Sequence, residues 1–423
     1  MTIQKTVLSN KLTILTDTLP TVKSVAAGLW IGAGSVCETE NNNGVAHFFE
    51  HMAFKGTPTR SALDVSLAID GVGGYLNAYT SREVTAYHGK TLSQDAPLLL
   101  DVLSDIVLHP LLEAEEMEKE RTVILQELMQ SIDTPDDIVF DYFQEMMFKN
   151  QSLARPILGT EESIKRLTPE MLKTFLQRFY GPDRTVIVAS GNIDHETHVA
   201  AVKQVYDAQG KVDPYEVEKH TYYGGIRHHV RSEMRQAQVL WGYQAPPRLS
   251  PEGDALKMAN VILSAGMSSR LVYEVREKAG LVYTISSFYQ GYRDTGFWAI
   301  YGGTAPEKVE QVLECSLRQV YNLADKGPTA KELEQARKQV AAQTHMAWES
   351  VSTRARIIGE YHTHTQCIID SEEEVNRLSA VTADEIRDVL RAMISTPVTS
   401  VVLASERAAM PTDAMLKTWN VSC

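Results

Sequence analysis

The amino-acid sequence predicts an α+β protein of two structurally similar domains, each a mostly antiparallel sheet flanked by helices. Its 423 residues exceed what one ordinary hydrophobic core requires. Strand-like and helix-like stretches are mixed along the chain, and their order in the first half returns in the second half at a spacing of roughly 210 residues. We therefore place an N-terminal domain at 1–215, a linker at 216–232 and a C-terminal domain at 233–423.

The first half contains the elements that matter most for function. Residues 22–34 combine β-branched and small residues before a glycine turn, which is typical of a strand. The Asn-rich loop 41–44 can cap a helix, and that helix is expected to end near Gly56. Residues 75–91 indicate two strands around a turn, and residues 113–132 indicate a long acidic helix.

Each of these elements has a counterpart in the second half. Residues 236–246 are strand-like, residues 253–265 are helix-like, residues 281–304 form a hairpin pattern, and residues 329–348 form a long helix pattern. The second half therefore predicts a second copy of the same fold unit.

Composition and charge exclude several classes of protein. The chain is 43% hydrophobic and 22% charged, as soluble globular proteins are. Its net charge of −13 argues against nucleic acid and leaves room for basic peptides, although solubility alone explains it equally well. The four cysteines are scattered, which suits a reducing compartment. No apolar run reaches the roughly 18 residues of a membrane helix, and the N-terminal residues lack a signal-peptide pattern. We expect a cytoplasmic protein that does not bind a membrane.

The stretch GVAHFFEHMAF places three polar residues in an apolar helix. His47 and His51 are four residues apart and therefore project from one helix face, with Glu50 beside them. Two imidazoles at this spacing can bind one zinc ion, and Glu50 can accept a proton from a water molecule at the open position. The alternative is two core histidines with a surface glutamate.

The second half provides a comparison for this motif. In a rough alignment, Leu256, Ala259 and Asn260 stand where the first half has its two histidines and glutamate. The polar residues are therefore not needed to build the fold unit, which favours a functional interpretation.

A zinc site with two protein ligands is incomplete, and the long acidic helix offers the third. Glu120 and Glu127 are seven residues apart and lie along the apolar stripe of helix 113–132. Carboxylates on a buried face need a metal or a partner. Pairing with Lys119 and Arg121 is the alternative.

Three motifs together resemble one known family. GVAHFFEHMAFKGT, GGYLNAYTSREVTAY and ERTVILQELMQSIDTPDD, in this order, resemble the M16 metallopeptidases, the inverted-zincin (inverzincin) or pitrilysin-type enzymes. The resemblance covers essentially the whole chain and is closest to the M16B branch, the bacterial homologues of mitochondrial processing peptidase. It implies the M16 metallopeptidase/LuxS-like fold and a zinc metalloendopeptidase activity of the EC 3.4.24 type.

The resemblance also assigns roles at the metal. It implies one Zn²⁺ per chain, held by His47, His51 and Glu127, since the family's third ligand follows the second histidine by 76 residues, as Glu127 does here. Glu50 is then the catalytic base, and Glu120 corresponds to a second glutamate that assists the ligand and the water.

Further residues are assigned by the same resemblance. Arg276 and Tyr283 match a substrate-binding pair that stabilises the tetrahedral intermediate. The alternatives for these two are a surface charge and a core aromatic. Asn77 and Ala78 match an edge strand that pairs with extended peptide. An ordinary edge strand is the alternative there.

Two acids match a specificity site of processing peptidases. Asp137 and Asp141 correspond to carboxylates that hold an arginine two residues before the cut. The alternative is a solvated helix start. The expected substrates are extended or unfolded peptides, including precursor or leader peptides with a basic residue near the cut.

The resemblance predicts a homodimer. The mitochondrial enzyme needs a partner subunit with a glycine-rich loop, whereas this chain carries both the zinc motif and the Arg276/Tyr283 pair. We expect this pair to act on the partner's zinc site. The rival prediction is a non-catalytic core or scaffold subunit of the M16 fold. A second group of possible metal ligands is His362, His364 and Cys367. No carboxylate stands at a recognisable ligand spacing from them, so we expect surface histidines there rather than a second metal site.

Overall fold

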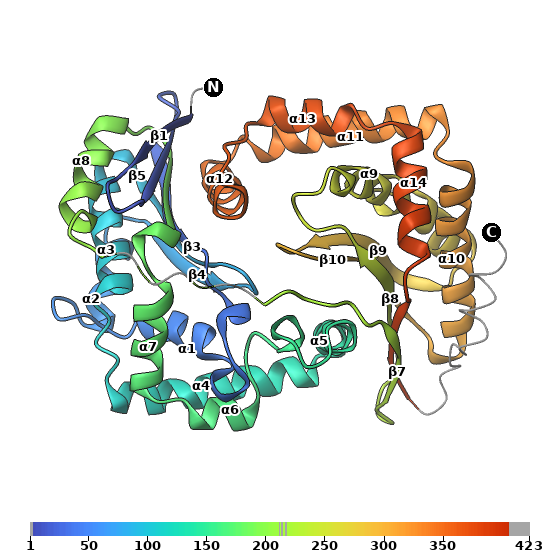
Figure 1. Cartoon of the computed structure of the whole chain (residues 1–423), viewed down its shortest axis with the longest axis horizontal. Helices are drawn as coiled ribbons and strands as arrows, with labels where there is room; N and C mark the ends of the chain where they lie inside the picture. The colour runs from blue at the N-terminus through green and yellow to red at the C-terminus, as the bar shows by residue number, and fades with distance from the viewer. Residues whose placement is uncertain (1–2, 211, 213–214, 216–217, 406–423) are drawn as a thin grey trace. The chain divides into compact units, whose positions relative to one another are not determined.

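The computed structural model describes residues 3–210, 212, 215 and 218–405 (Figure 1). These residues form two compact units. The first unit comprises Met1–Met129, Arg155–Glu218 and His345–Ser371, and the second comprises Gln130–Ala154, Lys219–Thr344 and Glu372–Cys423.

The first unit is built on a six-stranded mixed sheet. Its strands are β1 (Ile3–Val7), β2 (Thr13–Thr18), β3 (Ser24–Ile31), β4 (Tyr75–Thr80), β5 (Thr85–Leu92) and β6 (Thr185–Gly191). Their order in the sheet is β1-β2-β6-β3-β5-β4, so β4 lies at one edge. Only β2 and β6 pair in parallel, and the other neighbours are antiparallel, with Gly28 opposite Val188 and Ala78 opposite Tyr87.

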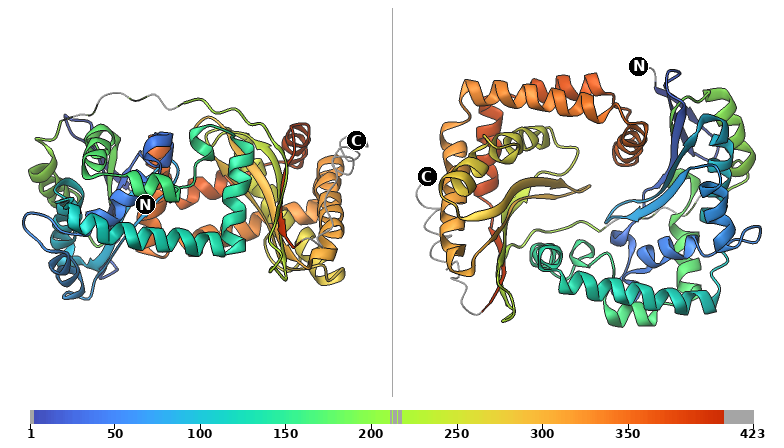
Figure 2. Two further views of the ribbon diagram at one scale, coloured as in Figure 1. Left: turned by 90° about the horizontal axis from the view of Figure 1, so that it is seen from below. Right: turned by 180° about the vertical axis from the view of Figure 1, so that it is seen from behind.

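Helices cover both faces of this sheet. The elements are α1 (Val45–Ala53), α2 (Ala62–Asp70), α3 (Ala96–Leu108), α4 (Ala114–Asp133), α6 (Glu161–Arg166), α7 (Pro169–Phe179), α8 (His195–Tyr206) and α12 (Val351–Thr365). Figure 1 and the right-hand view of Figure 2 show α12 on one face and α3 and α8 on the other. Because both faces are covered, β3 and β6 are buried almost throughout.

The helix α12 comes from the second half of the chain but packs on the first sheet. Its Gly359 lies so close to the Trp30 indole that a Cβ would stand 2.3 Å from Cδ2 of the ring. Arg354, 2% exposed, donates from Nη2 to Oδ1 of Asp17 (2.8 Å) and from Nε to Oδ2 (2.5 Å). These two contacts join segments 337 residues apart in the sequence.

The second unit repeats the sheet with five strands. They are β7 (Gly225–Val230), β8 (Ala237–Ala245), β9 (Val282–Gly291), β10 (Gly296–Thr304) and β11 (Thr399–Ala404). The order β7-β11-β8-β10-β9 matches β2-β6-β3-β5-β4, and the parallel pair β7/β11 matches β2/β6. The two halves of the sequence thus form the same sheet topology, and β1 is an addition to the first.

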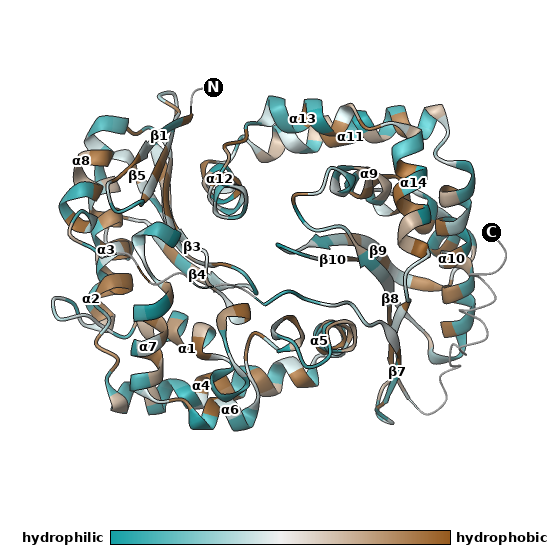
Figure 3. Ribbon diagram, in the orientation of Figure 1, coloured by the Kyte–Doolittle hydropathy of each residue, from teal (hydrophilic) through white to brown (hydrophobic). Residues whose placement is uncertain are grey.

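The helices of the second unit follow the same plan. They are α5 (Pro135–Met147), α9 (Glu252–Ser264), a π-helix (Val272–Lys278), α10 (Val309–Lys326), α11 (Ala330–Ala347), α13 (Ser371–Ser379) and α14 (Ala383–Ile394). In Figure 3, hydrophobic and hydrophilic residues alternate along α10 and α14, whose apolar sides join the core around Trp241 and Trp298. The helix α5 packs on β8 and β11.

The structure differs from the predicted domain boundaries. The sequence places contiguous domains at 1–215 and 233–423, but α5 belongs to the second unit and α12 to the first. Residues 225–230 of the predicted linker form the strand β7, while residues 216–217 lie outside the described residues. The repeat reveals two similar halves, but it does not indicate onto which sheet the helix that follows each long helix packs.

Removing the Arg354 guanidinium is expected to destabilise the first unit strongly. In Arg354→Ala the Asp17 carboxylate, 1% exposed, loses its buried cation and both hydrogen bonds from the guanidinium. We expect a loss of about 3–5 kcal/mol in the free energy of unfolding, measured by urea denaturation. The exposed pair Arg318–Glu314 provides the control, and Arg318→Ala should cost less than about 1 kcal/mol. Equal losses in the two variants would contradict this assignment.

Candidate metal centre

The helix α1 is fixed at its N-terminus by a buried carboxylate. Glu38, 3% exposed, accepts hydrogen bonds from the backbone N–H groups of Gly44 and Ala46 (2.9 Å each) and from Nδ2 of Asn43 (2.8 Å). Burial raises the pKa of Glu38 to about 7, and these hydrogen bonds oppose the rise. Gly44 has φ +90°, and a Cβ there would lie 2.7 Å from the backbone oxygen of Leu158. The first turn of α1 therefore has one defined position.

The structure brings His47, His51 and Glu127 together. The two imidazole rings are in edge contact, with centroids 4.6 Å apart. Oε2 of Glu127, on α4, lies 3.8 Å from Nε2 of His47 and 3.6 Å from Nε2 of His51. The potential ligand atoms of the three residues all lie within 4.8 Å of one another. Among the described residues, this is the one such group of three metal-ligating side chains.

The chemistry of this group fits a metal ion. His47 is 7% exposed, and burial, followed by the charge of His51, lowers its pKa to about 3, so its imidazole is neutral as a ligand must be. Its Nδ1 is buried without a hydrogen-bond partner among the described residues. Two histidines and a glutamate are the ligand set of catalytic zinc sites, where ligand atoms stand about 3.3 Å apart. The observed separations need only a small closure.

A second carboxylate orients His51. Nδ1 of His51 donates to Oε1 of Glu120 (2.8 Å), and Nζ of Lys55 lies 2.5 Å from Oε2 of the same carboxylate. Burial raises the pKa of Glu120, but the hydrogen bonds from His51 and Lys55 outweigh it and lower the pKa overall. An ionised Glu120 fixes the ring orientation and directs Nε2 toward Glu127. Sequence reasoning missed Lys55, although it lies four residues after His51.

Glu50 lies on the same helix and reaches the end of β4. Its Oε2 accepts a hydrogen bond from Oγ1 of Thr80 (2.5 Å). Burial raises the pKa of Glu50, and the Thr80 hydrogen bond partly offsets this rise. A carboxylate with a raised pKa is suited to accepting and returning a proton. Sequence reasoning singled out Asn77 and Ala78 on this strand but missed Thr80.

Asn77 and Ala78 lie on the edge strand β4. Among the residues that the structure describes, β4 pairs only with β5, so its second edge has no strand neighbour there. The backbone N–H of Ala78 donates to the side-chain oxygen Oδ1 of Asn77 (2.9 Å). An added peptide strand would compete for this N–H group.

The other predicted site residues belong to the second unit. Arg276 is on the π-helix, with its guanidinium carbon 5.9 Å from the ring centroid of Tyr283, which is 83% exposed on β9. Asp137 and Asp141 lie on α5, where Asp137 accepts a hydrogen bond from Oγ of Ser131 (2.7 Å). The metal-ligand group belongs to the first unit.

The prediction of surface histidines at His362 and His364, in the last turn of α12, is wrong for His362. This side chain is fully buried, and its Nδ1 donates to the backbone oxygen of Cys367 (2.8 Å). The reason is that α12 packs against the first sheet, so one side of a helix with a polar sequence is covered. Cys367 is a free, exposed cysteine.

The fold and this site together define a two-domain α+β protein with a His-His-Glu metal-ligand group and a neighbouring glutamate. The sequence model described as insulinase (peptidase family M16) matches residues 13–161, and that of the peptidase M16 inactive domain matches residues 166–340. The chain belongs to peptidase family M16.

Relatives agree with this family, and a solved structure shares the fold. An uncharacterized zinc protease of Streptomyces coelicolor is 35% identical over 399 residues, covering 92% of this chain and 87% of that protein. The uncharacterized zinc protease YmxG of Bacillus subtilis is 34% identical over 397 residues, covering 93% and 96%. A crystal structure of a peptidase M16 inactive domain from Pseudomonas fluorescens has a TM-score of 0.90 at 20% identity, covering 97% of this chain and 100% of that one. None of the described helices is long and apolar enough to cross a membrane.

Removing one metal ligand is expected to abolish metal binding. We expect purified wild-type protein to contain about one zinc per chain, and His47→Ala to contain less than about a tenth of that, because two remaining ligands hold zinc weakly. Inductively coupled plasma mass spectrometry measures the content. Glu118→Ala on the exposed side of α4, where Glu118 pairs with Arg121, is the matched control and should keep its zinc. Full zinc content in His47→Ala would refute the ligand assignment.

Proposed function

We propose that the protein is a zinc endopeptidase that cleaves extended or unfolded peptides. One observation carries this proposal: Glu50 connects by hydrogen bond to the edge strand β4 at Thr80 and stands beside a histidine and glutamate group suited to zinc. Substrate binding, metal and proton acceptor thereby meet in one place. The names of the relatives as zinc proteases support the same activity.

The residues of the first unit have distinct roles at the metal. His47, His51 and Glu127 hold the metal, and Glu120 with Lys55 keeps His51 oriented. When bound, zinc acts as a Lewis acid that polarises the scissile carbonyl group and makes a water molecule more acidic.

Peptide binding follows from the free edge of β4. An extended peptide forms main-chain hydrogen bonds along Asn77 and Ala78, which makes binding tolerant of sequence. The strand ends at Thr80, whose hydroxyl group holds Oε2 of Glu50. Oε1 of Glu50 is therefore the oxygen that carries the proton. It accepts the proton of the attacking water molecule and passes it to the leaving amine.

The finer parts of the proposal concern the second unit. Tyr283 and Arg276 donate hydrogen bonds to the developing oxyanion, and we assign this contribution to the partner subunit of a homodimer. Asp137 and Asp141 favour a substrate arginine near the cut, which points to precursor or leader peptides of the kind that M16B processing peptidases cut. We place the enzyme in the cytoplasm. A non-catalytic scaffold subunit is the rival, and the complete ligand set argues against it.

Replacing the proposed base should remove activity while keeping the metal. In Glu50→Gln the amide cannot accept a proton, so we expect kcat for a quenched fluorescent peptide to fall by about 10²–10⁴-fold. Zinc content should stay near one per chain, because Glu50 is not a ligand. Glu116→Gln serves as the control, because it makes the same change of charge at a glutamate that is ion-paired with Lys119 at the surface. A Glu50→Gln protein that cleaves at the wild-type rate would overturn the mechanism, and wild-type protein without peptidase activity would favour the scaffold.

Mixing two inactive chains tests the assignment to a partner subunit. His47→Ala lacks a metal ligand and Arg276→Ala lacks an oxyanion donor, but a mixed dimer has one complete site. We expect the mixture to recover up to about a quarter of wild-type activity under random pairing, measured after native mass spectrometry confirms mixed dimers. Confirmed mixed dimers without any recovery would show that Arg276 does not act across the dimer.

A further inference from the structure

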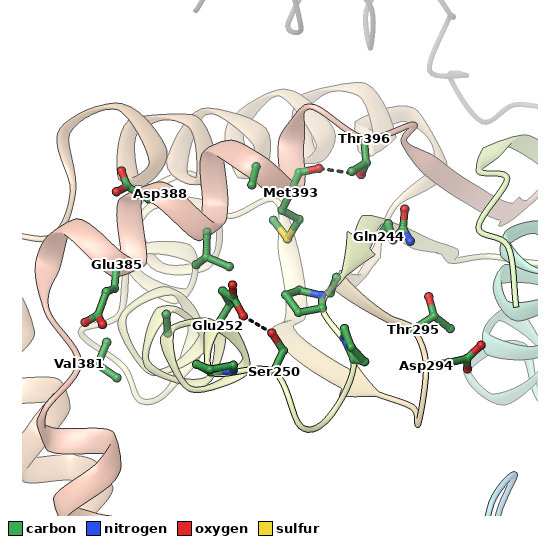
Figure 4. A pocket seen from close by; sticks show the side chains of 17 residues that line it. Gln244, Ser250, Glu252, Asp294, Thr295, Val381, Glu385, Asp388, Met393 and Thr396 are labelled. Carbon is green, nitrogen blue, oxygen red and sulfur yellow. Dashed lines mark hydrogen bonds between the residues drawn. The ribbon is translucent and has the colours of Figure 1, made fainter. Parts of the chain in front are cut away.

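The second unit carries an open pocket that the proposed chemistry does not use. Its volume is about 680 Å³. The end of β8 with the following loop, the first turn of α9, the turn between β9 and β10, and α14 form its walls (Figure 4). All lining residues belong to the second unit, so the pocket is defined without reference to the metal centre.

The inner surface of the pocket is apolar and preformed. Pro246 and Pro247 line one wall, and Val389 and Met393 of α14 line another. The hydroxyl group of Tyr289 donates to the backbone oxygens of Pro246 (2.8 Å) and Pro247 (3.1 Å), which fixes the proline loop. Proline also restricts the backbone, so a ligand meets a wall that needs little reordering.

The pocket is also acidic. Four carboxylates line it, those of Glu252, Asp294, Glu385 and Asp388. No lysine, arginine or histidine is among the described residues that line it. In Figure 4 the acids lie on both sides, with Asp294 beside Thr295 and the other three toward α9 and α14. Asp294 accepts from Nδ1 of His220 (3.0 Å), and Asp388 pairs with Nε of Arg387 (3.2 Å).

The other two acids are held by neutral donors. Glu252 accepts a hydrogen bond from the hydroxyl group of Ser250, and Glu385 accepts from the backbone N–H and Oγ1 of Thr382 (2.7 Å each). These hydrogen bonds lower the pKa of both carboxyl groups, so both are ionised at neutral pH. Hydroxyl and amide donors position a carboxylate but do not cancel its charge.

A buried hydroxyl group in the wall lacks a partner. Thr295 is 2% exposed and lines the pocket, and its Oγ1 has no hydrogen-bond partner among the described residues. A buried hydroxyl group without a partner is unfavourable, whereas a peptide group of a ligand would satisfy it.

We propose that this pocket binds an extended peptide segment in which a lysine or arginine is flanked by apolar side chains. The cation is attracted to Glu252 and Glu385, the apolar side chains pack on the prolines and on Met393, and a backbone group bonds to Thr295. Charge complementarity selects this occupant: nucleic acid and acidic peptides are repelled, and a purely apolar ligand leaves the carboxylates unused. The pocket is thus a docking site for a basic peptide or protein segment, separate from peptide cleavage.

Equilibrium binding of a defined probe tests this proposal. The probe is fluorescein-labelled Gly-Leu-Arg-Leu-Lys-Leu-Gly, and its affinity for the full-length Glu50→Gln protein is measured by fluorescence anisotropy, with mass spectrometry confirming that the probe stays intact. This background prevents cleavage if the proposed function is right and changes nothing in the pocket if it is wrong. Failure of the docking proposal and failure of the peptidase proposal are therefore distinguishable.

Two pocket variants and two matched controls decide the outcome. Glu252→Gln/Glu385→Gln removes both charges, and Ala392→Trp fills the pocket from an exposed position on α14. The controls are Glu314→Gln/Glu334→Gln, which changes net charge equally at surface ion pairs, and Ala342→Trp on the exposed surface of α11. We expect the Kd to rise at least tenfold in both pocket variants and less than twofold in both controls.

The comparison probe carries glutamate in place of arginine and lysine, and it should bind at least tenfold more weakly. Equal binding of the two probes would overturn the proposal, as would a Kd unchanged in the pocket variants. An equal loss of affinity in the charge control would also overturn it, because it would indicate non-specific attraction to an acidic surface. No measurable binding of the basic probe at millimolar protein would do the same.

Discussion

The buried carboxylate of Glu120 is the constraint on which the metal site depends. A charged group that is 5% exposed must be satisfied by partners, and its partners are His51 on α1 and Lys55 just beyond the end of that helix. The carboxylate therefore joins α4 to α1 and fixes which ring nitrogen of His51 faces Glu127. On the opposite end of α1, Glu38 fixes the first turn. Between these two anchors the positions of both histidines are determined.

The repeated sheet explains how one scaffold supports two different surfaces. Both units share a strand order with one parallel pair, and both place the first strand of the corresponding hairpin at an edge of the sheet. In the first unit this edge strand, β4, ends at Thr80, which donates a hydrogen bond to Glu50, whereas in the second unit β9 carries the exposed Tyr283. The helix α9, which follows β8 as α1 follows β3, has an apolar and amide surface in place of the ligands. The fold does not require the metal residues, so their presence in one copy reflects function.

Much of the architecture follows from local sequence. The hairpin predicted at 75–91 is present as β4 and β5. The long helix that carries Glu120 and Glu127 is α4, and the sequence repeat is present as two sheets of matching strand order. The contact of Glu127 with the two histidines also agrees with the predicted group. Such features depend on periodicity and on spacing within short segments, which a sequence displays directly.

Other features depend on contacts between distant segments and could not be predicted. The pairing of Arg354 with Asp17 places α12 on the first sheet, and no local sequence pattern predicts this pairing. The burial of His362 is a consequence of the same packing. Thr80 and Lys55 are ordinary residues in the sequence, and only the folded chain brings them to Glu50 and Glu120. The acidic pocket likewise combines three separate segments of the second half, 244–255, 294–295 and 381–396.

We infer that two imidazoles and one carboxylate hold zinc and leave an open position. X-ray absorption spectroscopy at the zinc edge of the purified protein tests this coordination. We predict two imidazole nitrogens at about 2.0–2.1 Å, oxygen ligands at about 2.0–2.2 Å and no sulfur. In Glu127→Ala this signal should be lost with the metal. A sulfur ligand at about 2.3 Å, or a spectrum that lacks imidazole scattering, would show that these three residues do not hold the zinc.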